Sequence, residues 1–348
     1  MQSEIRAAVI GAGYWGMNVV RVLQHTAGIW PTCVCDVRPE ALQEVKRQYP
    51  HVALHPFWEQ AIEDKHVDAV VVATPPATHY ALARAALCAG KHVWVEKPLA
   101  LQYAHGRELV ALAHERRRTL FVDETFLYDP LVQHARAMIA AGALGKVHHL
   151  SLERTGMGRI RRDSNVWWNS APHDLSILRY VLDAPVVRLS AAGHAFLQAG
   201  IEDVVWASLQ LDHDISALVY LNWVFPTKKA SLTVIGEHGL LEYEGRFGNR
   251  VLTRYEYRLG RAAVPSAEAR GQANLLPVKR NDVAEVLHGG PTEPLALACA
   301  AFRDSIVTGL PAPSGGEYSL QTLAVLDAGA RSLTQQGQWL SPGDLTSL

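Results

Sequence analysis

The sequence predicts two domains, a doubly wound parallel α/β sheet followed by a second domain built on a largely antiparallel sheet. The chain has 348 residues, more than one hydrophobic core usually serves, and 49% of them are hydrophobic. Residues 6–124 alternate apolar runs with amphipathic stretches, whereas residues 146–247 contain long runs in which apolar and polar residues alternate. This change of rhythm predicts the change of architecture.

The first domain is predicted from strands and helices that alternate along the chain. Apolar strands are expected within residues 6–13, 30–37, 68–76, 91–98 and 119–124. Amphipathic helices are expected within residues 14–26, 39–49, 78–90 and 103–117. Strands separated by helices join through right-handed crossovers, so they form a parallel, doubly wound sheet of the kind that binds nucleotides.

The second domain is predicted from alternating runs joined by turns. These runs occupy residues 146–156, 186–196, 203–212, 215–225, 229–237 and 239–247. They favour an antiparallel sheet with one face covered. Helices are expected over residues 173–183, 293–309 and 317–336, and residues 260–277 are expected to form a mobile loop.

Composition limits the possible partners. The 33 basic and 34 acidic side chains leave a net charge of -1, so there is no electrostatic reason to expect nucleic acid or an anionic membrane. No window approaches about 18 uninterrupted apolar residues, and the amino terminus lacks the apolar stretch of a signal peptide. We therefore expect a small-molecule ligand, no membrane association and a cytoplasmic location.

Metal sites are not expected. Cys33 and Cys35 point to the same face of an expected strand, where they have too few partners for a zinc site, and four cysteines in all fit a reduced setting. The 16 histidines show no paired spacing with carboxylates or thiols that would build a metal site.

A glycine pattern follows the first expected strand. In "VIGAGYWG", Gly11 allows a tight turn, Gly13 lets a pyrophosphate approach the backbone, and Gly16 permits close helix packing. Asp36 ends the second strand, where a carboxylate would bind an adenosine ribose. Together these features favour a dinucleotide site over a simple glycine-rich turn or an S-adenosylmethionine site. Asp36 favours NAD over NADP, although Arg38 would accommodate a 2'-phosphate.

Further candidates end the next two strands. Ligands of such sheets bind beyond the carboxyl ends of the strands, so Thr74, Pro75 and His79 should lie near the ribose or nicotinamide. His79 would equally serve as the first residue of a helix. In "HVWVEKPLA", Lys97 ends an apolar strand and is followed by Pro98, which fixes its direction. Lys97 is either part of a solvated turn or an ammonium group presented to the nicotinamide.

A second polar and aromatic group lies in residues 154–178. Pro172 is expected to start a helix there, which would place Asn169 and His173 four residues apart on a common side. A histidine near a redox cofactor is a suitable proton carrier. The alternative is a helix-capping asparagine with a structural histidine.

Several motifs resemble one known family. "GAGYWG", "ATPPATH", "EKP", "FLYDP" and "NVWWNSAPHDLSIL", followed by "PLALACAAFRDSIVTG" and "RSLTQQG", occur in the order found in the glucose-fructose oxidoreductase/inositol dehydrogenase (Gfo/Idh/MocA) family. The resemblance covers nearly the whole chain. It is closest to the subgroup acting on nucleotide-linked sugars, such as UDP-N-acetylglucosamine 3-dehydrogenases.

The resemblance implies an NAD(P)-binding Rossmann domain over residues 1–124. It also implies an α+β domain over residues 125–348, whose large open sheet joins subunits into a homodimer or homotetramer. Lys97 would touch both nicotinamide and substrate hydroxyl, and His173 matches the histidine of the family's Asp-x-x-x-His motif. The chain departs from the pattern at Asn169, where an aspartate is usual, at Gly156 in place of asparagine, and at Glu124 in place of histidine.

The resulting hypothesis is an NAD-dependent oxidoreductase that oxidises or reduces a sugar secondary alcohol, at C3 of a nucleotide-activated pyranose. The alternatives are a dehydrogenase or ketoreductase of a free sugar or cyclitol, and a non-catalytic NAD-dependent sensor. Lys97 and His173 are the expected catalytic residues. The expected cofactor contacts are Gly11, Gly13, Tyr14, Trp15, Gly16, Asp36, Arg38, Thr74, Pro75, His79, Glu96 and Lys97. The expected substrate contacts are Arg161, Asn165, Trp168, Asn169 and His173, with Arg154, Arg159, Arg162 and Trp167 as further candidates for holding a diphosphate or a sugar face.

Overall fold

The computed structural model describes residues 4–158, 160–246, 249–259 and 278–343. The expected mobile loop at 260–277 and Arg159 lie outside these residues. The chain forms two compact units, each described by itself. The first contains Met1–Asp129, Pro291–Ala328 and Pro342–Leu348, and the second contains Pro130–Gly290 and Gly329–Ser341.

The first unit contains the predicted doubly wound parallel sheet. Its strands are β1 (Ile5–Ile10), β2 (Ile29–Cys35), β3 (Ala53–His55), β4 (Ala69–Val72), β5 (His92–Val95) and β6 (Leu120–Val122). Its helices are α1 (Tyr14–His25), α2 (Pro39–Gln48), α3 (Trp58–Glu63), η1 (Pro76–Thr78), α4 (His79–Cys88), α5 (Tyr103–Arg116), η2 (Thr125–Tyr128) and α8 (Pro294–Thr308). The strand order is β3-β2-β1-β4-β5-β6 and every pairing is parallel, which confirms the predicted architecture.

The central strands β4 and β5 of this sheet are buried on both faces. All four residues of β4 are buried, as are Val93, Trp94 and Val95 of β5, which explains their continuous apolar runs. The sequence prediction omitted β3 and α3. β3 is three residues long with no buried member, so it leaves no apolar run to detect.

Carboxyl-terminal helices complete the first unit. α8 packs against α1 and η2, and Arg21 of α1 forms a two-pronged ion pair with Glu293 at 2.8 Å and 2.9 Å. The chain therefore returns to the first unit after residue 290. This division differs from the single boundary expected after residue 124, because amphipathic helices at the end of a sequence do not reveal which sheet they cover.

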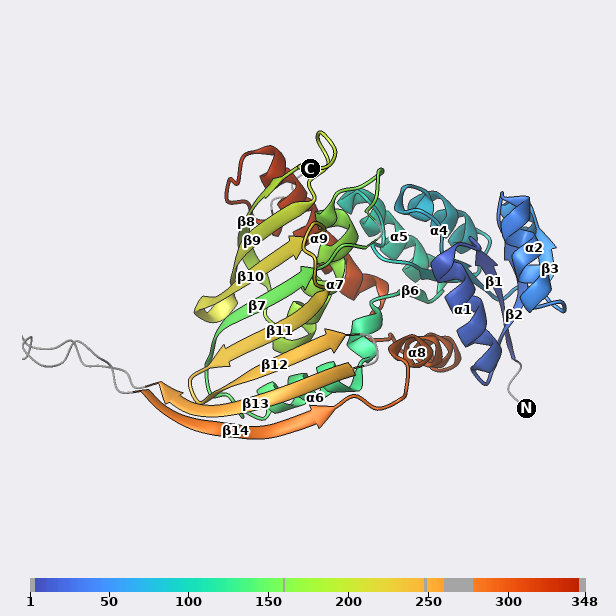
Figure 1. The fold of residues 1–348 in the computed structure, drawn as a ribbon. Coiled ribbons are helices and arrows are strands. Elements are labelled where there is room, and N and C mark those ends of the chain that lie inside the picture. The colour runs from blue at the N-terminus through green and yellow to red at the C-terminus, as the bar shows by residue number, and fades with distance from the viewer. Residues whose placement is uncertain (1–3, 159, 247–248, 260–277, 344–348) are drawn as a thin grey trace, which may run out of the picture. The chain divides into compact units, whose positions relative to one another are not determined.

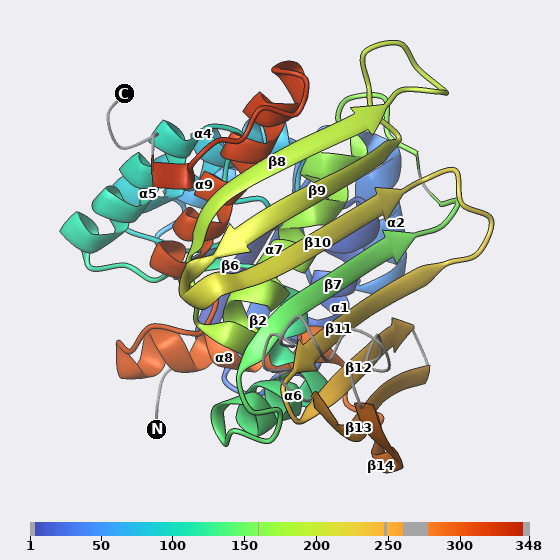
Figure 2. The same cartoon turned by 90° about the vertical axis from the view of Figure 1, so that its left-hand side faces the viewer.

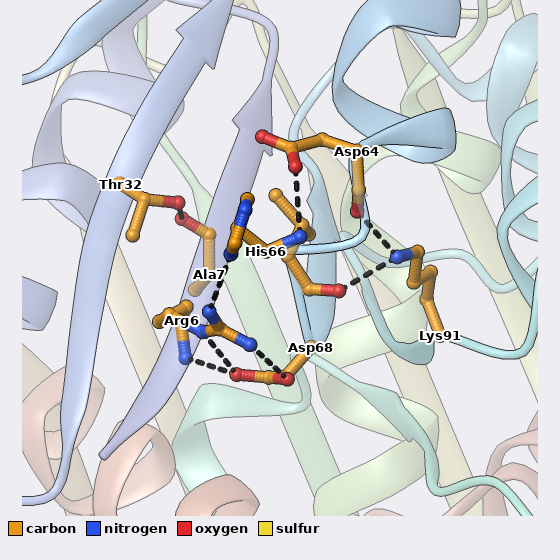
Figure 3. Close-up of polar contacts among 8 residues, drawn as sticks. Arg6, Ala7, Thr32, Asp64, His66, Asp68 and Lys91 are labelled. Carbon is orange, nitrogen blue, oxygen red and sulfur yellow. Dashed lines mark hydrogen bonds and ion pairs between the residues drawn. The ribbon is translucent and has the colours of Figure 1, made fainter.

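Polar contacts tie together the amino-terminal ends of the same strands (Figure 3). The Arg6 guanidinium on β1 grips both carboxylate oxygens of Asp68, which precedes β4, at 3.0 Å and 3.1 Å. The Lys91 ammonium, just before β5, is buried and donates to the carbonyl oxygens of Asp64 and Val67, each at 2.7 Å. These groups lie at the edge opposite the glycine loop, so we assign them to stability.

The second unit is built on an eight-stranded mixed sheet of order β14-β13-β12-β11-β7-β10-β9-β8. Its strands are β7 (Val147–Thr155), β8 (Val186–His194), β9 (Val204–Leu211), β10 (Ile215–Asn222), β11 (Lys229–Gly236), β12 (Gly239–Arg246), β13 (Asn249–Leu259) and β14 (Val278–His288). Its helices are α6 (Pro130–Ala140), α7 (Val166–Leu182) and η3 (Asp212–Asp214), and α9 (Gly316–Thr334) reaches into it with its last turns. Only β7 and β10 pair in parallel, so the mostly antiparallel prediction is confirmed.

Helices cover one face of this sheet. α7 packs on β7, β9 and β10, while α6 packs on β12 and β13. Figure 2 shows the other face of β8, β9, β10 and β7 without a helix of the described residues across it. The outward residues of β9 alternate with buried ones, as the sequence pattern required.

The edge strand β14 and its neighbour β13, long and curved in Figure 1, were not predicted. The β13 sequence "NRVLTRYEYRL" is rich in charge, and register shifts interrupt its pairing with β14. Elsewhere, none of the helices in the described ranges combines the length and apolar character needed to cross a membrane. Within the same ranges, no group of three or more His, Cys, Asp and Glu side chains is arranged to hold a metal ion.

Candidate cofactor and active site

The glycine loop has the geometry of a phosphate cradle. Gly11 has a φ of 99°, and a Cβ there would meet the Ala73 carbonyl oxygen at 2.5 Å. A Cβ at Gly16 would lie 1.8 Å from the Gly11 carbonyl oxygen, so α1 can approach the loop only if this residue is glycine. A Cβ at Gly13, by contrast, would meet nothing within 4 Å, and no side chain caps α1 at this residue. Open space at the amino end of α1 fits a bound pyrophosphate.

Asp36 closes the loop from the end of β2. Its carboxylate accepts a hydrogen bond from the Ala12 N–H at 2.8 Å, and its side chain is only 6% exposed. The Arg38 guanidinium donates to both of its oxygens, at 3.0 Å and 2.9 Å. Burial raises the pKa of Asp36, but the hydrogen bonds from Arg38 and Ala12 outweigh it and hold the pKa below its ordinary value. The anion is thus maintained where a ribose hydroxyl would donate.

Two aromatic residues open α1 beside this loop. Tyr14 and Trp15 are exposed, and their rings meet edge to face with centroids 5.6 Å apart. Gly11, Gly13, Gly16 and Asp36 lie close together at the carboxyl edge of the sheet, and these two rings adjoin them.

His79 is the first residue of α4 and is fully buried. Its Nδ1 lies 2.8 Å from the Pro98 carbonyl oxygen and its Nε2 lies 2.9 Å from the Thr74 carbonyl oxygen. Because carbonyls only accept hydrogen bonds, a protonated ring is needed to donate to both at once. His79 therefore braces the segments after β4 and β5. Pro75 lies outside this brace, and the Thr74 hydroxyl contacts that of Thr78 at 2.7 Å.

Lys97 follows β5 on the same sheet edge and is half-buried. The Lys97–Pro98 peptide is cis. Directly before it, Glu96 is 8% exposed, and Asp123 at the end of β6 is 1% exposed. They directly follow the paired residues Val95 and Val122, so the two carboxyl groups are neighbours, and Thr125 donates to Asp123 at 2.8 Å. Burial raises the pKa of both carboxyl groups. The neighbouring Asp123 carboxylate raises the pKa of Glu96 further.

The sequence prediction missed Asp123. The signal available was the polar pair "DE" directly after an apolar strand, at the position where the preceding strand carries "EK". Because parallel strands end at one sheet edge, two such pairs on neighbouring strands must meet.

The second unit carries the remaining candidates on α7. This helix begins at Val166, and Asn165 caps it by accepting a hydrogen bond from the Trp168 N–H at 3.1 Å. The expectation that Pro172 starts the helix is wrong, because Pro172 lies inside it. Asn169 and His173 remain four residues apart on α7, and both are half-buried.

Carboxylates hold two of the three expected anion-binding arginines that lie in the described residues. Arg154 makes a largely buried ion pair with Asp174 at 2.9 Å, and Arg161 grips Asp163 at 2.7 Å and 2.6 Å. Arg162 is exposed. These pairings reduce the number of guanidinium groups ready to hold a diphosphate.

Asn165, directly before α7, has a hydrogen-bond partner that was not predicted. Asn165 donates through its amide to Glu202 at 2.7 Å, which ties the loop to the start of β9. Trp167 is fully buried in the core, while Trp168 is half-buried. Asn165 therefore has a structural role that the motif alone did not reveal.

Gly156 directly follows β7 and has a conformation that favours glycine. Its φ is 135°, and a Cβ would lie 2.8 Å from the Lys228 Cα. An asparagine, expected here from the resemblance, would strain this backbone.

Comparison with known proteins identifies the family. Residues 5–124 match the model of the oxidoreductase family with an NAD-binding Rossmann fold, and residues 132–242 match that of the GFO/IDH/MocA C-terminal domain. The chain belongs to the Gfo/Idh/MocA family. Its first unit therefore contains an NAD-binding Rossmann domain, in agreement with the cradle formed by Gly11, Gly13 and Gly16.

The proteins to which the chain is similar include dehydrogenases of ring polyols and sugars. The inositol 2-dehydrogenase of Acidothermus cellulolyticus is 29% identical over 57% of this chain and 59% of its own length. A UDP-N-acetylglucosamine 3-dehydrogenase from Acidithiobacillus ferrooxidans has a TM-score of 0.77 at 22% identity, covering 95% of this chain and 98% of that one. An inositol dehydrogenase homologue from Azotobacter vinelandii, complexed with NADH and myo-inositol, has a TM-score of 0.78 at 20% identity, covering 97% and 98%.

The curated alignments are partial. They span 56%, 57% and 59% of the first three curated relatives, whereas the solved structures match along nearly the whole chain. These two structural likenesses, at 22% and 20% identity, show the fold.

Proposed function

We propose that this protein is an NAD-dependent oxidoreductase that transfers a hydride between nicotinamide and a secondary alcohol or ketone of a sugar. The observation that carries the proposal is the half-buried Lys97 at the same sheet edge as the glycine cradle and Asp36. When bound, NAD supplies the hydride acceptor. A cation fixed at this edge suits a reaction that develops negative charge on an alcohol oxygen.

The chain's own residues would share the remaining chemistry. The Lys97 ammonium polarises the reacting oxygen and stabilises developing alkoxide charge. His173 takes or returns the hydroxyl proton, since an imidazole titrates near neutral pH. Asn169, one helical turn before it, would orient a sugar hydroxyl by donating and accepting, but it cannot carry a proton. His173 would therefore act without the aspartate usual at this position.

A nucleotide-activated sugar oxidised at C3 is the leading substrate. Its support is the run of motifs shared with nucleotide-sugar dehydrogenases and the fold shared with a UDP-N-acetylglucosamine 3-dehydrogenase. Arg162, exposed before α7, is one cation suited to a phosphate.

A free sugar or cyclitol is the second candidate. The pairing of Arg154 with Asp174 and of Arg161 with Asp163 favours it, because a substrate without a diphosphate needs neither guanidinium. The likeness to inositol dehydrogenases also supports this class.

The first experiment measures reduction of stoichiometrically bound NAD+ by its absorbance. Nucleotide sugars, free sugars and inositols are added separately, and the corresponding ketones are tested from the NADH side. A signal with one class identifies the substrate class. Bound cofactor with no reaction in either direction would refute the proposal and favour the non-catalytic sensor.

Lys97→Met tests the central assignment. We expect loss of turnover by at least a factor of about 100, in the range typical of lost electrostatic or acid-base groups, with NAD binding retained. Lys65→Met removes an exposed lysine of the same unit and serves as the matched control. Full activity of Lys97→Met would exclude this lysine from the chemistry.

The proposal also includes a cytoplasmic setting and assembly through the sheet of the second unit. Four free cysteines, three of them buried, are compatible with a reducing compartment. The proposed assembly is a homodimer or homotetramer.

A further inference from the structure

His79 lies at the part of the sheet edge over which the nicotinamide half of the cofactor is expected to extend. The candidate ribose ligand Asp36 follows β2 and the glycine loop follows β1, so the rest of a dinucleotide continues over β4 and β5, the next strands in the sheet. His79 contacts the segments after both strands, through the carbonyls of Thr74 and Pro98. Thr74 also adjoins the glycine loop, because a Cβ on Gly11 would lie 3.0 Å from its methyl group.

The two contacts of this ring require two protons. Nδ1 lies 2.8 Å from the Pro98 carbonyl oxygen and Nε2 lies 2.9 Å from the Thr74 carbonyl oxygen, and neither oxygen can donate. A neutral imidazole carries one proton, so one of its nitrogens would present a lone pair to a carbonyl oxygen at hydrogen-bond distance. Because the His79 side chain is fully buried, solvent would not relieve this repulsion.

Two effects oppose a cation at this position. Burial disfavours the charged ring, and so does the positive amino end of α4, which begins at His79. Lys97 is a second cation at this edge, whereas the buried carboxyls of Glu96, Asp123 and Glu124 follow β5 and β6. Hydrogen bonds from an ionised donor are roughly twice as strong as neutral ones, and the charged ring makes two of them. The two short contacts are therefore the observation that favours the cation.

We propose that the buried His79 ring carries a proton on each nitrogen and is a fixed positive charge that makes the cofactor site prefer NADH to NAD+. The oxidised nicotinamide ring is a cation and the reduced ring is neutral, so a positive charge nearby disfavours only the oxidised form. Bound NAD+ is thereby a stronger hydride acceptor than free NAD+. This inference rests on NAD binding by the Rossmann domain and on no particular sugar substrate.

Neutron diffraction from crystals of perdeuterated wild-type protein at neutral pH shows the protons directly. We expect deuterium on both Nδ1 and Nε2 of His79. His92, at the opposite edge of the same sheet, is the internal control, because its Nδ1 accepts a hydrogen bond from the Thr119 N–H at 3.0 Å and should carry no deuterium. A single deuterium on the His79 ring would overturn the proposal.

Calorimetric titration of the cofactor-free protein with NAD+ and with NADH tests the consequence. His79→Gln removes the charge and leaves a neutral hydrogen-bond donor. We expect the ratio of the NAD+ dissociation constant to that of NADH to exceed one in the wild type. It should fall about tenfold in His79→Gln, which is the effect of one charge at roughly 10 Å in an effective dielectric of about 20. His92→Gln removes a neutral imidazole and should leave the ratio unchanged.

The ratio of the two dissociation constants separates charge from bracing. Loss of a purely structural residue weakens both cofactors equally, so an unchanged ratio in His79→Gln would overturn the electrostatic role even if both nitrogens are protonated. If His79→Gln fails to fold, a wild-type ratio of one or less would overturn the preference for NADH. Neither measurement uses a substrate, so absence of turnover with every sugar would refute the proposed function and leave this inference standing.

Discussion

At the scale of single residues, replacing His79 tests whether its ring holds together the segments after β4 and β5. His79→Asn cannot span the Pro98 and Thr74 carbonyls, which lie 2.8 Å and 2.9 Å from the two ring nitrogens. At least one buried carbonyl would lose its donor, which costs about 1–3 kcal/mol of unfolding free energy. Urea unfolding measures the loss, with the exposed His25→Asn as control. Equal stability of both variants would show that His79 is not a brace.

Arg38 and Asp36 give a second residue-scale prediction, on cofactor choice. Arg38 is bound to Asp36, and its half-exposed guanidinium remains available to a 2'-phosphate. Arg38→Ala should weaken NADP+ binding about tenfold or more, the loss of a charge-assisted bond, while NAD+ affinity changes little. Calorimetric titration with each cofactor measures this difference. A parallel loss for both cofactors would show that Arg38 does not read the phosphate.

At the scale of elements, the amino-terminal end of β5 predicts a pH dependence. Burial first, and the Arg118 charge second, lower the pKa of His92 from 6.5 to about 4. The unfolded chain binds this proton at higher pH than the folded chain does. The contribution of His92 to the free energy of unfolding should therefore be fully present above about pH 6.5. It should fall by about 1–2 kcal/mol towards pH 4, allowing for the partial exposure of the ring.

Urea unfolding of wild type and His92→Gln across this pH range checks the prediction. In His92→Gln the free energy of unfolding should no longer show the decrease caused by His92 at acid pH, while His25→Asn should still show it. Identical pH profiles for wild type and His92→Gln would assign the fall to other groups.

The elements also show what could be predicted from sequence. The apolar runs of β1, β4 and β5 are continuous because both faces of the sheet are buried, so their class and order were predictable. β13 and β14 were missed because charged residues at a sheet edge hide the alternation. The start of α7 was misplaced because Pro172 is a typical first-turn residue, whereas the cap is made by Asn165.

The residues of the candidate site also divide into those that the sequence could predict and those that it could not. Gly11, Gly16 and Asp36 were predictable because a tight turn, a close helix contact and a carboxylate at a strand end leave local sequence patterns. Glu202 was not, since its partner Asn165 is distant in sequence and only the fold brings them together. Asp123 was missed because its signal appears only when the polar pairs after two neighbouring parallel strands are considered together.

At the scale of the whole molecule, the open sheet face bears on assembly. Leu218 on β10 is 38% exposed and Trp206 on β9 is 39% exposed, although both lie on central strands. Around them the face carries small hydroxyls, including Ser216, which contacts His149 at 2.8 Å. The face also carries paired polar groups, Arg188 with Gln210 and Glu153 with Lys229, which leaves the exposed apolar side chains as its unpaired contact area for a second copy of the same sheet. We therefore expect the face seen in Figure 2 to bind a second copy of this chain.

Leu218→Glu tests this assembly. A charge at the centre of a self-complementary face appears twice in a symmetric dimer, so each copy would bury a carboxylate against its counterpart. We expect the mass in solution, measured by light scattering after gel filtration, to fall by half or more. Leu310→Glu is the control, because Leu310 is 69% exposed and belongs to the first unit. If Leu218→Glu keeps the wild-type mass, or if the wild type is already a monomer, the sheet face is not the assembly interface. A Leu218→Glu monomer that still binds NAD would further show that the Rossmann site forms without the partner.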